Sequence, residues 1–336
     1  MTEPCPVTFL IVTPSFNAPE FLDETIESIV SQRGDFTIRY HIQDGGSTDR
    51  TLDLLALWAE RLAAERLRVD LPPLHFSWKS EPDRSMYDGI QKGFDELLRR
   101  QVSDAPGLVI MTWINTDDLF APNAFQTVAQ FLRANPEEQW VTGIPCLIRE
   151  DGCIADTRLE GFGYARARLA QGQYDGRQFP FVMQEGTFWT RELWLAAGGL
   201  NVDLRLSGDW DLWRRMARFQ RLITVRGVLA YHRRRPGQLS GDMERYWVEL
   251  DQCLSGAAQD AGSDRQLTGE RLALEGAWTA SWRIKQERWA MSPSRYRRDG
   301  LLHCISDCLV ESWGKHPLGR SLIRLYRRLR GIQIDD

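Results

Sequence analysis

Apolar residues in the first third of the chain alternate between continuous runs and helical spacing. The continuous runs predict buried β-strands at 7–12, 36–43, 74–78 and 108–114. Apolar residues that recur on one side of a helix predict helices at 19–32, 49–65 and 85–100. This alternation of strand and helix predicts an α/β fold with a mostly parallel, doubly wound sheet.

The pattern becomes less regular after Val141. We predict a hairpin formed by 140–149 and 153–157, and a mobile acceptor loop in the segment 161–181, which is rich in Gly, Arg and aromatic residues. The remaining predictions are a strand at 184–189, a short helix ending at 197, a helix at 209–218 and a largely helical chain from 240 onward.

Polar segments follow each of the four predicted strands. Ligands of doubly wound sheets bind outside the carboxyl ends of the strands. The segments 13–17, 44–49, 81–88 and 115–118 are therefore expected along one edge of the sheet.

Asp117 and Asp118 follow the fourth strand as adjacent carboxylates. Like charges this close raise each other's pKa, and a divalent cation such as Mg²⁺ or Mn²⁺ removes that cost. The alternative interpretation is the start of a helix near Pro122, with an aspartate as its cap.

Two glycines in the segment 44–49 permit a tight turn after the second strand. Asp44 then faces the edge, where its carboxylate can accept hydrogen bonds from a base or ribose. The alternative is a turn in which Ser47 or Thr48 caps the next helix. The first strand is not followed by a G-x-G-x-x-G fingerprint, which argues against a dehydrogenase.

The segment 80–89 places four charged residues before a helix. Arg84 is a candidate phosphate contact, and Asp83 or Asp88 a candidate contact to a ribose or sugar hydroxyl. A solvated loop with a serine or aspartate cap is the alternative, but Tyr87 is an unusual choice for such a loop.

Asp209 and Asp211 lie at the start of a predicted apolar helix, where the helix dipole favours a carboxylate. In the functional interpretation Asp209 is a general base that accepts the proton of an attacking hydroxyl, and Asp211 is the second candidate. Further along, His232 can complete the metal shell begun by Asp118, and the following arginines, starting with Arg233, can hold a diphosphate. The alternative for that run is a basic surface.

The composition sets limits on the class of protein. A net charge of −4 over 336 residues gives no general reason to expect nucleic acid as a partner. No apolar run approaches the roughly 18 residues of a membrane-spanning helix, and the N-terminus does not resemble a signal peptide. The six cysteines show no zinc spacing, which predicts reduced thiols in a cytoplasmic protein.

Taken together, these motifs resemble those of glycosyltransferase family 2, whose members have the GT-A fold. The motifs are Thr13-Pro14-Ser15-Phe16-Asn17, Asp44-Gly45-Gly46-Ser47-Thr48-Asp49, Asp83-Arg84-Ser85-Met86-Tyr87-Asp88, Asn115-Thr116-Asp117-Asp118 and Gly208-Asp209-Trp210-Asp211. Each motif is moderately specific, but five in this order are strongly specific. The resemblance covers roughly residues 7–240.

The resemblance implies transfer of a sugar from a nucleotide-diphosphate donor to an acceptor hydroxyl, with inversion and a divalent metal (Mn or Mg) as cofactor. A UDP-sugar is favoured over deoxythymidine and guanosine donors, and the acceptor is expected to be a glycan or lipid-linked molecule of surface polysaccharide or glycolipid synthesis. The expected donor contacts are Thr13, Pro14, Asn17, Asp44, Asp83, Arg84, Asp117 and Arg233. The expected metal ligands are Asp117, Asp118 and His232, and the expected catalytic base is Asp209.

The chain departs from the family pattern at two positions. Asn115 stands where many members carry the first aspartate of the metal motif, and Gly208 replaces the glutamate that often precedes the base. These departures leave open a catalytically inactive, nucleotide-sugar-binding scaffold. A sugar nucleotidyltransferase would be expected to have a Gly-rich, basic loop after the first strand, and 13–20 contains neither Gly, Lys nor Arg.

We expect a GT-A domain at 1–240, with a nucleotide-binding half at about 1–120 and an acceptor half at about 121–240, followed by a helical C-terminal region at 241–336. Lys285 replaces the Gln of the processive Gln-x-x-Arg-Trp motif, which indicates a non-processive enzyme. The segment 315–330 has leucines at helical spacing and six Lys or Arg residues. It is either a helix docked on the domain or a peripheral membrane-surface helix.

Overall fold

The computed structural model describes residues 5–64, 70–100, 107–157, 163–177, 179–236, 238, 242–260, 277–283 and 288–293. The predicted helix at 315–330 and Lys285 lie outside these residues. None of the helices in the described ranges has the length and apolar character needed to cross a bilayer.

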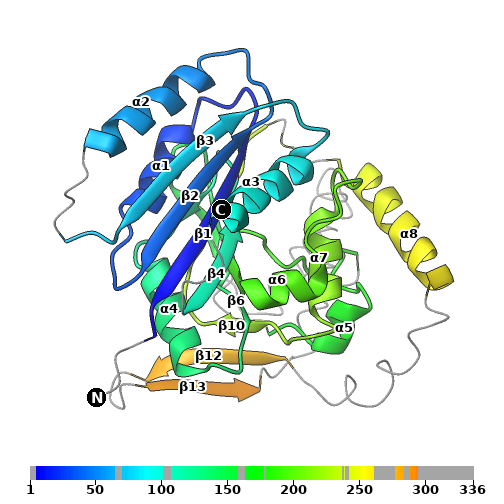
Figure 1. The fold of residues 1–336 in the computed structure, drawn as a ribbon. Helices are drawn as coiled ribbons and strands as arrows, with labels where there is room; N and C mark the ends of the chain where they lie inside the picture. The colour runs from blue at the N-terminus through cyan, green and yellow to red at the C-terminus, as the bar shows by residue number, and fades with distance from the viewer. Residues whose placement is uncertain are drawn as a thin grey trace, which may run out of the picture.

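Within the described residues, the main sheet has nine strands in the order β13–β12–β10–β6–β9–β4–β1–β2–β3 (Figure 1). Four parallel strands form its N-terminal half: β1 (Val7–Ser15), β2 (Thr37–Asp44), β3 (Leu74–Ser80) and β4 (Leu108–Trp113). β9 (Thr187–Thr190) lies antiparallel between β4 and β6 (Trp140–Thr142), and β10 (Ile223–Val225) continues parallel to β6. The sheet is therefore mixed, as the GT-A resemblance implies.

Side chains of β1 alternate between two hydrophobic cores. Phe9 and Ile11 pack with α1 (Leu22–Val30), α2 (Thr51–Ala64) and α4 (Ala124–Ala134). Leu10 and Val12 pack on the opposite face with α3 (Met86–Arg100), α6 (Arg191–Ala197) and α7 (Gly208–Met216). Helices thus cover both faces, which explains why the first strands are continuous apolar runs.

A second sheet has the order β5–β11–β7–β8 in the described chain. Its strands are β5 (Leu119–Phe120), β11 (Ala230–Arg233), β7 (Cys146–Ile148) and β8 (Ile154–Thr157). β7 and β8 form the predicted hairpin. The segment expected as one strand at 140–149 is instead divided, because Gly143 and Pro145 separate β6 from β7 and direct them into different sheets.

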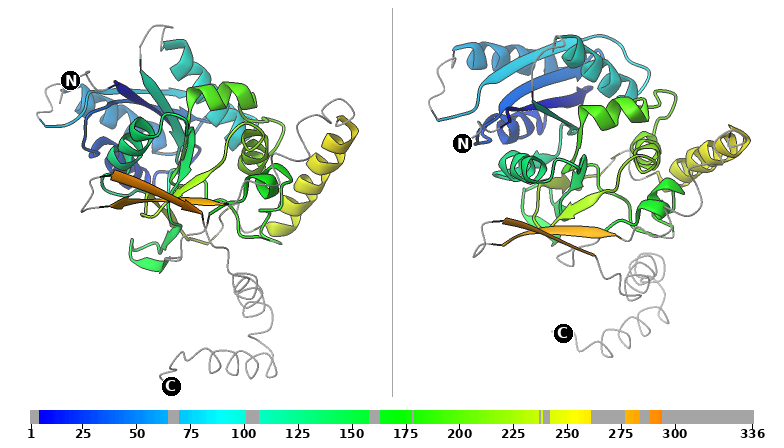
Figure 2. Two further views of the ribbon diagram at one scale, coloured as in Figure 1. Left: turned by 90° about the horizontal axis from the view of Figure 1, so that it is seen from below. Right: turned by 60° about the horizontal axis from the view of Figure 1, so that its bottom comes forward.

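The C-terminal region is not wholly helical, and in this respect the prediction was wrong. α8 (Met243–Asp260) is a helix, but β12 (Trp278–Arg283) and β13 (Arg288–Pro293) form a strand pair at the edge of the main sheet (Figure 2). The ring of Trp289 packs edge-on against Phe131 of α4 at 5.2 Å between centroids. Residues beyond 240 therefore contribute to the main sheet and its core.

The predicted edge is formed as expected. Ser15 pairs with Asp44, and Asp44 pairs with Ser80, so β1, β2 and β3 end at the same level. The backbone N–H of Gly45 donates to Ser15 O at 2.8 Å, and that of Glu81 donates to Asp44 O at 2.9 Å. The loops after these strands are joined into one surface.

Candidate active site

Asn17 connects the first two loops of the edge. Its backbone N–H donates to Ser47 Oγ at 2.8 Å, and its side-chain oxygen accepts from the Thr48 N–H at 2.9 Å. Its φ of 46° lies in the left-handed region, which asparagine tolerates better than most residues. Thr13 is fully buried and accepts a hydrogen bond from the Tyr40 hydroxyl at 3.0 Å. Pro14, the last expected contact of this loop, pairs with Gln43 of β2 in a buried position.

Asp44 closes its own loop. One oxygen accepts from the backbone N–H of Gly46 and Ser47 at 3.0 and 2.8 Å and from the Ser80 hydroxyl at 2.6 Å. The other accepts from the Ser47 hydroxyl at 2.5 Å, and the side chain is fully buried. Asp44 therefore shapes the loop, and its expected contact with a base stays a prediction.

Asp83 and Arg84 lie beside that loop. A Cβ on Gly45 would lie 2.7 Å from Asp83 Oδ2, so the absence of a side chain there lets Asp83 approach. Burial raises the pKa of Asp83. Arg84 is exposed, and its guanidinium lies 3.5 Å from Asp88 and from Asp203 in two surface ion pairs. Both predicted donor contacts are thus at the edge, with Arg84 free to reorient.

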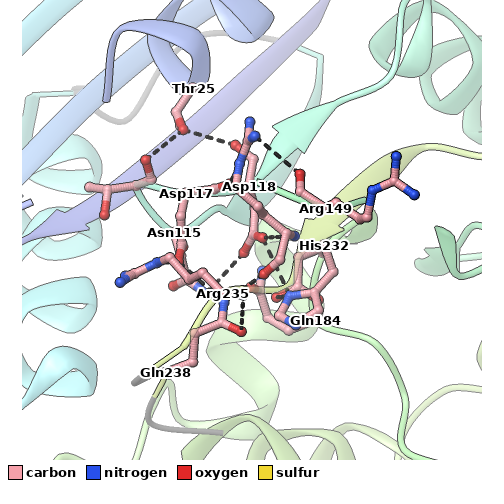
Figure 3. Close-up of polar contacts among 12 residues, drawn as sticks. Thr25, Asn115, Asp117, Asp118, Arg149, Gln184, His232, Arg235 and Gln238 are labelled. Carbon is pink, nitrogen blue, oxygen red and sulfur yellow. Dashed lines mark hydrogen bonds and ion pairs between the residues drawn. The ribbon is translucent and has the colours of Figure 1, made fainter. Parts of the chain in front are cut away.

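Asp118, Glu185 and His232 form the candidate metal centre. One ligand atom from each lies within 4.8 Å of the others. His232 Nδ1 is 3.3 Å from Asp118 Oδ1 and 3.4 Å from Glu185 Oε1. Asn115 donates to the other oxygen of Asp118 at 3.3 Å, so it supports the cluster from behind (Figure 3). Glu185 was not predicted, because nothing in its local sequence sets it apart.

The donor set fits a hard divalent cation. Two carboxylates and an imidazole are ligands that Mn²⁺ and Mg²⁺ accept. The Oδ1 of Asn115 is buried and has no hydrogen-bond partner, and His232 Nδ1 is held only by its two ion pairs, without hydrogen-bond geometry. A cation would neutralise the paired carboxylates and give the imidazole nitrogen a partner.

The charges in this centre depend on one another. Burial alone would lower the pKa of His232, but the carboxylates of Glu185 and Asp118 outweigh it and raise that pKa to about 11. Burial and the charge of Glu185 raise the pKa of Asp118 to about 7. The three groups therefore titrate as a unit in which His232 carries a proton at neutral pH.

Asp117 does not join the metal centre. Its Oδ2 accepts from Arg235 Nε at 2.6 Å and from Gln238 Nε2 at 3.3 Å (Figure 3). In this structure its carboxylate is paired with a cation, and its expected roles as a metal ligand and donor contact stay predictions. The Asp117–Arg235 pair instead places a guanidinium beside the centre.

Arg233 also departs from the prediction. Its side chain is fully buried, and its guanidinium donates to Asp117 O at 2.9 Å, Glu150 O at 2.7 Å and Glu24 Oε2 at 2.6 Å. All these acceptors belong to the protein, so Arg233 holds the loop that carries Asp117 and Asp118. Arg235, whose side chain is 34% exposed and pairs with Asp117, is open to a ligand on this side of the centre.

Asp209 lies in the first turn of α7 with a half-buried side chain. Its Oδ1 accepts from the Tyr87 hydroxyl at 3.1 Å and from the Trp210 N–H at 2.8 Å. Burial raises its pKa to about 6, with the charge of Glu185 acting in the same direction. A carboxylate with this pKa is ionised at neutral pH and is a stronger base than an exposed aspartate.

Asp211, the second candidate base, lies in a different environment from Asp209. Asp211 is buried and pairs with Arg214 at 3.2 Å and Arg215 at 2.8 Å, which makes it a structural anion of α7. The departure at Gly208 also has a reason: a Cβ there would lie 2.7 Å from the ring of Tyr87. Glycine at this position lets Tyr87 reach Asp209.

An open cavity of about 1130 Å³ lies elsewhere, between α1, α2 and the second sheet. Glu24, Trp58, Phe120 and Tyr231 are among its lining residues. None of the candidate catalytic or metal-binding residues lines it, so we do not assign the reaction to this cavity.

These features define a nucleotide-sugar transferase of the GT-A type. Residues 6–235 match the family model described as "Glycosyltransferase like family 2", and the chain belongs to this family. A "PGL/p-HBAD biosynthesis glycosyltransferase" of Mycobacterium tuberculosis is 26% identical over 60% of this chain and 67% of its own length. An "Uncharacterized glycosyltransferase" of the same species is 23% identical over 71% of this chain and 82% of its own length.

Solved structures show a more distant likeness. The mannosyltransferase PcManGT from Pyrobaculum calidifontis, crystallised with GDP-Man and Mn²⁺, has 19% identity and a TM-score of 0.48 over 77% of this chain and 65% of that chain. S. aureus TarS 1–349 has 12% identity and a TM-score of 0.47, with 67% of this chain covering 60% of that one.

Proposed function

We propose that this protein is a metal-dependent, inverting glycosyltransferase that moves one hexosyl group from a nucleotide-diphosphate donor to an acceptor hydroxyl. One observation carries the proposal: the protein has both a compact Asp118–Glu185–His232 centre and a separate carboxylate, Asp209. The charge of Glu185 helps to raise the pKa of Asp209. The centre can bind the cation that accompanies a diphosphate, and Asp209 can accept a proton from an acceptor hydroxyl.

Asp118, Glu185 and His232 would hold the cation. When bound, a divalent ion supplies positive charge that stabilises the leaving diphosphate. Arg235, fixed by Asp117 and partly exposed, adds a further positive charge at the same place. The loops at Asn17 and Asp83 form the side of the edge that would receive the nucleoside.

Asp209 accepts the proton of the acceptor hydroxyl as that oxygen attacks the anomeric carbon. Tyr87 holds the carboxylate through Oδ1, which leaves Oδ2 for the acceptor. Attack from the face opposite the diphosphate inverts the anomeric configuration. The mycobacterial relatives named for PGL/p-HBAD biosynthesis favour a glycolipid acceptor, and the altered Gln-x-x-Arg-Trp motif favours single additions.

A two-stage assay tests this function. Thermal shift with nucleotide diphosphates and their sugars, with and without Mn²⁺, identifies the donor, because a ligand of the folded state raises the melting temperature. Nucleotide release is then measured with glycolipid and glycan acceptors. We expect Mn²⁺-dependent release that requires acceptor. Donor binding with no turnover across the acceptor panel would instead indicate an inactive binding scaffold.

A further inference from the structure

Helix α8 lies beyond the part of the chain that matches the family model. The match ends at residue 235, and α8 spans Met243–Asp260. In Figures 1 and 2 this helix lies on the side of the molecule that carries α5 (Arg166–Ala170) and α7. Its contacts show what it does there.

Glu249 of α8 accepts four hydrogen bonds from the turn that precedes α7. Its Oε1 accepts from the backbone N–H of Leu206 at 2.9 Å and of Ser207 at 2.8 Å, and from the Ser207 hydroxyl at 2.8 Å. Its Oε2 accepts from the Arg205 N–H at 2.9 Å. Hydrogen bonds to an ionised acceptor are short and strong, so this side chain fixes the turn.

The same turn holds the candidate base. Leu206 O accepts from the Tyr87 hydroxyl, which also contacts Asp209 Oδ1, each at 3.1 Å. Ser207 is the N-cap residue of α7, and its carbonyl accepts from the Asp211 N–H at 3.0 Å. A shift of the turn would therefore move both Tyr87 and Asp209.

Neighbouring residues of α8 contact a second segment, 175–181. Trp247 Nε1 donates to Asp175 O at 3.1 Å. Asp251 forms a two-bond pair with Arg177 at 2.9 and 3.1 Å. The ring of Tyr246 lies edge-on to that of Phe181 at 5.4 Å between centroids. The helix thus joins this segment to the turn that carries the base.

We infer that Glu249 is a positioning residue for glycosyl transfer: from α8 it fixes the turn at 205–207 and so orients Asp209 toward the acceptor. This inference rests on the proposed role of Asp209 as the base. It makes α8 a part of the acceptor side of the site.

Glu249→Gln tests the inference, with Glu244→Gln as the matched control. Gln places an N–H₂ group where a carboxylate oxygen now accepts, whereas Glu244 is exposed on the same helix. We expect Glu249→Gln to speed hydrogen exchange of the amides at 205–208 and to lower kcat about 10- to 100-fold, with the donor KM unchanged. Glu244→Gln should change neither quantity.

Ser207→Ala provides a second, smaller change, because it removes one hydroxyl bonded to Glu249. It should lower kcat in the same direction, and the double variant should lose no more than Glu249→Gln alone. It also keeps the test open should Glu249→Gln not fold.

Two results would overturn the inference. Unchanged exchange at 205–208 in Glu249→Gln would show that Glu249 does not fix the turn, and faster exchange with full kcat would show that the turn does not orient the base. A wild-type protein without transfer activity would contradict the proposed function itself. The exchange measurement, which needs no substrate, would still report whether Glu249 fixes the turn.

Discussion

The hydroxyl of Tyr87 in α3 lies 3.1 Å from Asp209 Oδ1 in α7, although the two residues are 122 positions apart in the sequence. The phenol is buried, and its hydrogen bond favours the ionised form of the carboxylate. This contact opposes the effect of burial, which raises the pKa of Asp209 to about 6. The Trp210 N–H and, to a smaller extent, the Tyr87 hydroxyl therefore favour the ionised form of Asp209.

Tyr87→Phe is expected to move the acid limb of the pH profile of kcat/KM to higher pH by about one unit, the equivalent of one hydrogen bond to a charged group. Without the phenol the ionised carboxylate is less stable, so the pKa of Asp209 rises and activity is lost earlier as pH falls. Activity at pH 6 should fall more than activity at pH 8. An acid limb at its wild-type position would contradict this role.

Gly208→Ala should reduce kcat by displacing the ring of Tyr87, because the added Cβ would lie 2.7 Å from ring carbons. Gly227→Ala is the matched control, since a Cβ there meets nothing within 4 Å. We expect a kcat loss of about 10-fold or more for the first variant and wild-type kcat for the second. Equal activity of the two variants would show that the ring position is unimportant.

Glu185→Gln should weaken Mn²⁺ binding at least about 10-fold, because even residues that only orient metal ligands contribute 10- to 100-fold. Isothermal titration of the protein with Mn²⁺ measures this directly. Glu192→Gln, on an exposed side chain of α6, should bind as the wild type does. Wild-type affinity in Glu185→Gln would remove Glu185 from the metal centre.

Mn²⁺ binding should release about one proton at pH 7, because a ligating imidazole must be neutral. In the metal-free centre His232 is protonated: burial opposes this, but Glu185 and Asp118 raise its pKa to about 11. Affinity should therefore increase with pH by about one logarithmic unit per pH unit. Titration in two buffers of different ionisation enthalpy counts the protons, and a heat independent of the buffer would argue against ligation by His232.

Arg233→Ala should mainly lower the stability of the fold, whereas Arg235→Ala should mainly weaken donor binding. Loss of Arg233 leaves the buried carbonyl of Asp117 without its side-chain donor, at a cost of about 1–3 kcal/mol in the free energy of unfolding. Arg235 is partly exposed, so its loss should change stability by less than about 1 kcal/mol but weaken donor binding. Urea unfolding and donor titration of both variants measure the contrast, and the reverse pattern would return Arg233 to the donor site.

The N-terminal half of the fold could be predicted from sequence because each element carries its own periodicity. The edge formed by Ser15, Asp44 and Ser80 then follows from parallel order alone. The β12–β13 pair was missed, although Trp278 and Ala280 alternate with polar residues as in a strand. This two-residue period is short, so the region was predicted to be helical with the rest of the chain from 240 onward.

Site residues were predictable where a motif marked them and less so where the contact is long-range. Motifs marked Asp118 and Asp209, and the structure brings His232 to 3.3 Å from Asp118; the roles of the three residues stay predictions. Glu185 joins Asp118 and His232 only through the folding of β9 and β11, and no spacing in the sequence reports that distance. The arginine run could not reveal that Arg233 is buried and Arg235 partly exposed. Arg233 is the last residue of β11 and Arg235 lies beyond the strand, so the burial of each depends on the acceptors that it meets in the folded protein.

The most direct test of the central claim compares Asp209→Asn with Asp203→Asn, an exposed aspartate of the preceding loop, in single-turnover transfer and donor binding. The account predicts that Asp209→Asn lowers the transfer rate about 10²- to 10⁴-fold while donor affinity stays at the wild-type value, and that Asp203→Asn retains transfer. Retained transfer in folded Asp209→Asn, or a loss of donor affinity that accounts for its loss of activity, would contradict the role of Asp209 as the base.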